Sequence, residues 1–106
     1  MKTAMRYLGV MRGCGSLACG DGGSLGRVEY EIEGFLTRTG EIVGSAEIRM
    51  APGDLDNAFG RRDLQLTTEQ GRVLDVRFSG KRGDAGSAAA HADIGGDLPP
   101  ASQWRR

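Results

Sequence analysis

The feature that most constrains the fold is an alternation of apolar and polar side chains over residues 27–50. Successive side chains of a β-strand point to opposite faces of a sheet, so this period of two gives one apolar and one polar face. Thr-Arg-Thr-Gly at 37–40 is typical of a hairpin turn between two such strands. The pattern therefore predicts two long antiparallel strands. Their register is well specified, because a one-residue shift would move every apolar side chain to the solvent face.

The remaining elements are predicted with the same logic. Residues 62–79 repeat the alternation and predict a second hairpin, and residues 3–12 predict a first strand. Between the hairpins, Asp54 is expected to cap a short helix from Leu55 to Phe59. The large apolar residues at even positions in the two hairpins would form one sheet face: Val28, Tyr30, Ile32, Leu36, Ile42, Ile48, Met50, Leu64, Leu66, Leu74, Val76 and Phe78.

These elements predict an all-β fold, a small five-stranded antiparallel barrel or strongly bent sheet. One short helix lies between the third and fourth strands, which is the element order of an OB-type barrel. If the sheet closes, its apolar face becomes the barrel interior. If it stays open, the helix covers only part of that face, and a two-fold homodimer is the simplest completion. The size of the face favours the homodimer.

Residues 1–80 are expected to form a single β domain, followed by a flexible tail over 81–106 in which Trp104 is an anchor. The tail contains mainly small, polar and structure-breaking residues and lacks the hydrophobicity to fold alone. Within the domain, the glycine-rich segment 13–26 is expected to be a long mobile loop, because glycine has a high entropic cost of ordering.

The charges balance, with 14 basic and 14 acidic residues, so no overall field recruits nucleic acid or a membrane. They are segregated, however: residues 28–60 have a net charge of −5 and residues 61–83 of +3. No apolar run approaches the roughly 20 residues that span a bilayer. Arg6 and Arg12 interrupt any signal-peptide core. We therefore expect a cytoplasmic protein whose Cys14 and Cys19 are reduced thiols.

Chemically reactive residues are few and poorly arranged. Cys14 and Cys19 have four residues between them, and only His91 remains as a further strong metal ligand, so no metal site is predicted. His91 with Asp93 is half of an acid–base arrangement, but nothing in the sequence places a nucleophile beside them. No cofactor motif follows a strand and opens a helix. We expect no metal, no cofactor and no enzymatic activity.

Three functions remain open. The first is a non-catalytic binding or assembly module, whose partner is an unknown protein or a second copy of this chain. The second is single-stranded nucleic-acid binding through the basic hairpin, with two aromatic rings for stacking; its residues are Arg61, Arg62, Arg72, Arg77, Lys81, Arg82, Tyr7 and Phe35. The third is thiol redox or metal chemistry at Cys14 and Cys19. The first is favoured.

Overall fold

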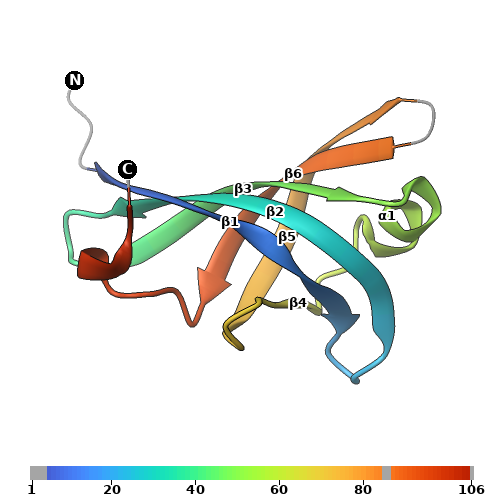
Figure 1. The fold of residues 1–106 in the computed structure, drawn as a ribbon, viewed down its shortest axis with the longest axis horizontal. Coiled ribbons are helices and arrows are strands. Elements are labelled where there is room, and N and C mark those ends of the chain that lie inside the picture. Colours follow the sequence, from blue (N-terminus) through green and yellow to red (C-terminus); the bar gives the residue numbers. More distant parts are fainter. Residues whose placement is uncertain (1–4, 85–86, 106) are drawn as a thin grey trace.

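The structure is a computed structural model that describes residues 5–84 and 87–105. Six strands, one α-helix and one short 3-10 helix follow each other along the chain (Figure 1). They are β1 (Arg6–Cys19), β2 (Ser24–Leu36), β3 (Ile42–Met50), α1 (Pro52–Ala58), β4 (Leu64–Thr67), β5 (Val73–Asp84), β6 (Ser87–Gly96) and η1 (Ala101–Gln103).

The strands form a closed barrel in the order β1-β2-β3-β6-β5-β4, and all neighbouring strands are antiparallel. The predicted all-β barrel, with its one helix between the third and fourth strands, is confirmed. The predicted count of five strands is wrong, because a sixth strand lies between β3 and β5. The apolar face predicted from the two hairpins is the barrel interior, where Ile32, Ile48 and Leu74 are fully buried.

The sixth strand corrects the prediction that the segment after residue 80 is a flexible tail. β5 continues to Asp84, and β6 pairs with both β3 and β5. Ala88, Ala90, Ala92 and Ile94 alternate along β6 and are buried. Three of these four side chains are methyl groups, so the alternation carries too little hydropathy to predict a strand. The strand forms because β3 and β5 supply its hydrogen-bond partners and the larger part of the apolar packing.

The expected mobile loop over 13–26 is also wrong, because most of this segment belongs to β1 and β2. Gly13 and Gly15 occupy alternate positions of β1. A Cβ atom on Gly13 would lie 2.7 Å from the Tyr30 hydroxyl, and one on Gly15 would collide with the Thr67 carbonyl oxygen. These glycines therefore permit close packing of neighbouring strands, a role that composition alone does not distinguish from flexibility.

The three hairpin turns that lie wholly within the described residues, β1–β2, β2–β3 and β4–β5, share one hydrogen-bond pattern. In the β2–β3 turn, the backbone N–H of Thr37 donates to the carbonyl of Glu41 (2.8 Å), and the N–H of Gly40 donates to the carbonyl of Thr37 (3.0 Å). The same two bonds recur at Cys19–Gly23 and at Thr68–Arg72. The fourth residue of each turn is a glycine with φ near +90°. Residues that carry a Cβ strongly disfavour this conformation, which explains why the fourth residue of each turn is glycine.

Helix α1 lies at one end of the barrel, where it contacts β2 and β6 and buries Leu55 and Ala58 (Figure 1). It begins at Pro52, three residues before the predicted start, with Ala51 as its N-cap. Asp54 is therefore in the first turn instead of at the cap. Its negative charge is favourable there because the first-turn N–H groups point toward it.

The C-terminal arm, residues 97–105, lies at the end of the barrel opposite α1 (Figure 1). Trp104 is buried, and its indole N–H donates to the Pro99 carbonyl at 3.0 Å. The arm rests on a cross-strand pair of glycines, Gly9 of β1 and Gly34 of β2. A Cβ on Gly34 would lie 2.7 Å from the Trp104 ring, and one on Gly9 would collide with the backbone of Arg105. The predicted anchoring by Trp104 is thus present.

Candidate ligand-binding groove

A groove lies where the barrel wall is completed by the arm instead of by a strand. β1 pairs with β2 over nearly its whole length but with β4 only through Ser16–Cys19. Nearer its start, β1 bonds to the arm, where the Val10 N–H donates to the Arg105 carbonyl at 2.7 Å. The groove in this region has a volume of about 410 Å³ and is lined by Val10, Met11, Arg12, Tyr30, Gln70, Arg72, Pro99, Gln103 and Arg105. We call it the arginine groove.

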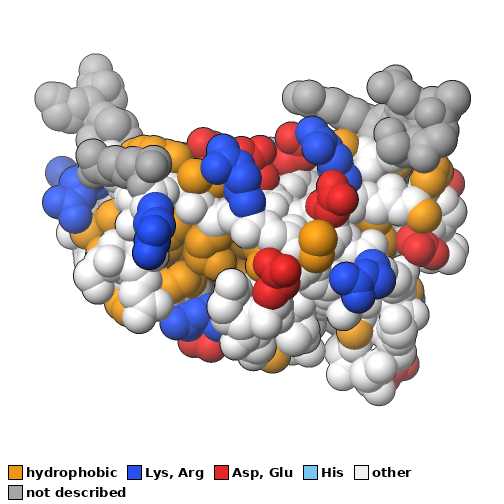
Figure 2. Space-filling view, viewed as in Figure 1, with side chains coloured by type: hydrophobic (Ala, Val, Ile, Leu, Met, Phe, Trp, Pro, Cys, Tyr) orange, Lys and Arg blue, Asp and Glu red, His pale blue; other side chains and the backbone are white. Residues whose placement is uncertain are grey.

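Three arginines enter this groove from separate parts of the chain. Arg12 comes from β1, Arg72 from the end of the β4–β5 turn, and Arg105 from the arm. None of the lining residues is an aspartate or a glutamate. Figure 2 shows apolar surface bordered by basic side chains on the face where β1 lies in front. The lining thus combines apolar surface with guanidinium groups, which match carboxylates and phosphates in a two-pronged geometry.

Two of the arginines are held in place by hydrogen bonds, and of their acceptor residues only Gln103 lines the groove. Nη1 of Arg72 donates to the backbone carbonyl of Asp97 at 3.2 Å and also lies 3.4 Å from the Asp97 carboxylate. Nη2 donates to the side chain of Gln103 at 3.2 Å. Arg12 bonds to a single oxygen of Glu31 through Nε (2.9 Å) and Nη2 (2.8 Å). Its Nη1 has no partner among the described residues. Because these side chains are already positioned, binding an anion would cost less side-chain entropy.

Tyr30 lies beneath the arginine groove and connects it to the β4–β5 turn. Its ring is buried beside Gly13, and its hydroxyl bonds to the backbone of Glu69 and the side chain of Thr68. Burial raises the pKa of the Tyr30 hydroxyl above its ordinary value, since the phenolate would lose hydration. Tyr30 therefore stays neutral at physiological pH and adds no negative charge to the groove.

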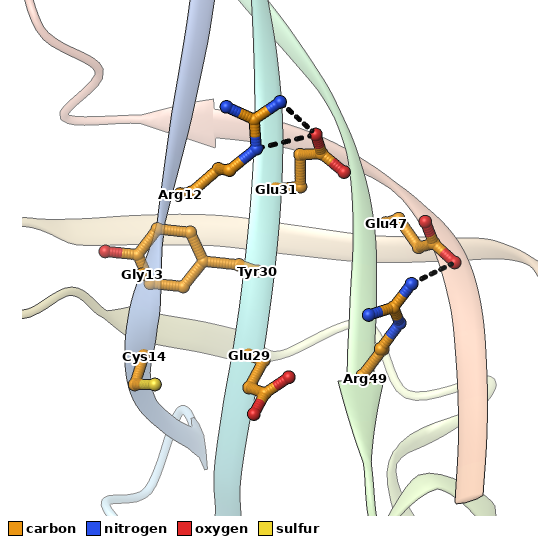
Figure 3. A pocket seen from close by; sticks show the side chains of 8 residues that line it. All are labelled: Arg12, Gly13, Cys14, Glu29, Tyr30, Glu31, Glu47 and Arg49. Atoms are coloured by element: carbon orange, nitrogen blue, oxygen red, sulfur yellow. Dashed lines mark hydrogen bonds and ion pairs between the residues drawn. The ribbon is translucent and has the colours of Figure 1, made fainter.

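A second groove, which shares Arg12 and Tyr30 with the first, crosses the outer faces of β1, β2 and β3 (Figure 3). Its charges largely cancel. Arg12 pairs with Glu31 at 2.8 Å, Arg49 approaches Glu47 at 3.9 Å, and Glu29 adds a third carboxylate. Exposed pairs of this kind contribute little to stability. Since its carboxylates outnumber its arginines, this groove suits an anion less well than the arginine groove.

The structure separates the basic residues proposed for nucleic-acid binding. Arg72 lines the arginine groove, whereas Arg62 and Arg77 lie on the β4–β5–β6 outer face among Asp63, Asp75 and Asp93. Arg61 is occupied by a two-pronged bond to Asp63, both contacts being 3.0 Å. This bonding lowers the pKa of the Asp63 carboxyl. The side chains of Lys81 and Arg82 lie outside the described residues. The predicted set therefore includes one groove residue, Arg72, and misses Arg12 and Arg105.

The two rings proposed for base stacking do meet. Tyr7 and Phe35 face each other across β1 and β2, with ring centroids 5.5 Å apart. They lie on the outer face of β1 and β2, and around the barrel β4 lies between β1 and the β5 arginines. Glu33 lies two residues before Phe35 on the same face of β2. The rings and the basic hairpin do not form one continuous surface.

Cys14 and Cys19 are not close enough to act together. They stand five positions apart on one extended strand, which corresponds to a Cα separation of roughly 16 Å. A disulfide requires about 7 Å or less. Their positions in β1 have opposite parity, and Cys19 is buried whereas Cys14 is half-buried. Among the described residues, no group of three or more His, Cys, Asp or Glu side chains is arranged to hold a metal ion.

His91 gains a partner that the sequence did not reveal. Ser45 of β3 lies opposite β6, and its hydroxyl is 3.2 Å from Nε2 of His91. A hydrolytic serine also needs a third group that orients the histidine and donors for the oxyanion. No carboxylate bonds His91 in the part of the chain that the structure describes, and neither Ser45 nor His91 lines the two grooves. We interpret the contact as a surface hydrogen bond.

No protein-family model, curated protein or solved structure matches this chain. Within the described residues, no helix has the length and apolar character needed to cross a membrane.

Proposed function

We propose that this protein is a small, non-catalytic binding module that holds an anionic organic ligand in the arginine groove. The observation that carries the proposal is the convergence of Arg12, Arg72 and Arg105 on one groove whose lining contains no carboxylate. The volume of about 410 Å³ suits a small molecule. Val10, Met11 and Pro99 offer apolar contact, so the preferred ligand carries a phosphate or carboxylate on an apolar body.

Phenyl phosphate is a suitable probe because it joins an anionic group to an apolar ring. Binding is measured by isothermal titration calorimetry at low and moderate salt, beside inorganic phosphate and benzyl alcohol. We expect phenyl phosphate to bind more tightly than either, and more weakly as salt rises. Benzoate in place of phenyl phosphate separates a carboxylate preference from a phosphate preference.

Two arginine variants test whether phenyl phosphate binds in the arginine groove. Arg105→Gln removes a groove cation that has no side-chain partner among the described residues. Arg77→Gln removes a cation from β5 that does not line this groove. We expect Arg105→Gln to weaken phenyl phosphate binding about tenfold, as the loss of one charge-assisted hydrogen bond predicts, and Arg77→Gln to leave it unchanged. Equal effects of the two substitutions would refute the assignment to the arginine groove.

Single-stranded nucleic acid remains the alternative ligand, and the same variants test it. A labelled oligothymidine that binds at low salt, loses affinity with Arg77→Gln and keeps it with Arg105→Gln would favour the basic-hairpin hypothesis.

We further propose a reducing, cytoplasmic setting, in agreement with two thiols that do not pair.

A further inference from the structure

The arginine groove depends on a segment that is not part of the barrel sheet. Three of its lining residues, Pro99, Gln103 and Arg105, belong to the C-terminal arm. A fourth, Arg72, is held by arm residues, through the Asp97 carbonyl and the Gln103 side chain. Without the arm in place, the groove would lose one wall and the orientation of a second arginine.

The arm packs against a pair of glycines in the barrel wall, which we call the seat of the arm. Gly9 and Gly34 are directly paired across β1 and β2, and both positions leave room that a Cβ would fill. The Trp104 ring occupies the space above Gly34, and the Arg105 backbone occupies the space above Gly9. Gly9 has a φ of +145°, a conformation that side chains rarely adopt. Two glycines at one cross-strand position thus create the seat.

We infer that Trp104 is a positioning residue for the ligand site, and that seating of the arm and binding of the anion are thermodynamically coupled. The inference rests on the proposed function of the arginine groove. A ligand held by Arg72 and Arg105 interacts fully only with the seated arm, so it must favour seating. By reciprocity, the seated arm raises ligand affinity by the same factor.

Gly34→Val tests the coupling because valine is well tolerated in strands and its side chain would occupy the place of the Trp104 ring. The matched control is Gly95→Val in β6, where a Cβ meets nothing within 4 Å. Trp104 is the single tryptophan of the chain, so its fluorescence reports seating directly. We expect Gly34→Val to shift the emission to the red, to increase quenching by acrylamide and to weaken phenyl phosphate binding at least about tenfold. Gly95→Val should change none of these.

The reciprocal effect is measured in the wild-type protein. Phenyl phosphate should slow hydrogen exchange of the Val10 amide, which bonds to Arg105, and reduce quenching of Trp104. If Gly34→Val does not fold, Trp104→Ala removes the ring instead, and calorimetry with Val10 exchange replaces fluorescence.

The outcomes separate the two proposals. If the wild-type protein binds phenyl phosphate and a variant with a released arm binds it equally well, the coupling is wrong and the groove assignment stands. If Trp104 stays buried in Gly34→Val, the seat itself is wrong. If the wild-type protein binds no phenyl phosphate, the proposed function fails, and the coupling fails with it.

Discussion

Gly15→Ala tests whether the glycines of β1 serve close packing or flexibility. A Cβ at residue 15 would collide with the backbone carbonyl oxygen of Thr67 and lie 3.1 Å from Cδ1 of Leu66. The collision can be relieved only by moving β4 away from β1. These two strands pair through only four residues each, Ser16–Cys19 and Leu64–Thr67, and this pairing closes the barrel.

The expected loss is worked out from two destabilising terms and one stabilising term. Overpacking in a well-packed interior costs roughly 1–3 kcal/mol, and each weakened β1–β4 hydrogen bond adds about 1 kcal/mol. Replacing glycine by alanine restricts the unfolded chain and returns about 0.4–1 kcal/mol. The net expectation is a loss of about 2 kcal/mol in the free energy of unfolding. For a domain of this size, that lowers Tm by roughly 8–16 °C.

Urea denaturation followed by far-UV circular dichroism measures the change, with thermal melts as a second readout. Gly95→Ala is the matched control, because this strand glycine has open space around its Cβ position. It should gain about 0.4–1 kcal/mol, since only the unfolded state is affected. In a mobile loop at 13–26, Gly15→Ala would leave the free energy of unfolding almost unchanged, because the substitution would restrict the folded and unfolded states alike. That result would refute the close-packing argument.

Three further predictions follow from the same structure. Tyr30→Phe should lower the free energy of unfolding by about 0.5–1.5 kcal/mol, because it removes the hydrogen bonds of the hydroxyl. Since folding raises the pKa of Tyr30, the wild-type free energy of unfolding should be at its full value below about pH 10 and should fall as the pH rises above it. Urea titrations at several pH values should find a weaker decline in Tyr30→Phe. Sedimentation equilibrium at micromolar concentration should give a mass near 11.3 kDa, which is that of a monomer. The reason is that the closed barrel buries the apolar sheet face within one chain, and this face was the ground for expecting a homodimer. A doubled mass would contradict this. Cys14 should react with a maleimide faster than the buried Cys19, and mild oxidation should produce no disulfide within the chain. Equal reaction rates, or a mass lower by two hydrogens after oxidation, would contradict the strand geometry.

The sequence by itself determined those strands whose inward side chains are large. The alternation around Tyr30 and Ile32, and again around Leu74 and Val76, is visible because one face must be buried and the other is polar. Local chemistry also defined the turns, since glycine at their fourth position adopts a φ near +90°. The barrel interior therefore follows from sequence with the correct faces.

Tertiary structure alone decided the elements whose inward side chains are small. Gly13 and Gly15 of β1 and the alanines of β6 carry no hydrophobic pattern of their own, so they become strands only beside partners that fill the space. The candidate site depends on the same long-range pairing. Arg12, Arg72 and Arg105 are distant in sequence, and they meet because the Gly9–Gly34 pair seats the arm against β1. Local sequence encodes a turn or a buried face within a few residues, whereas a groove between three segments exists only once the barrel has closed.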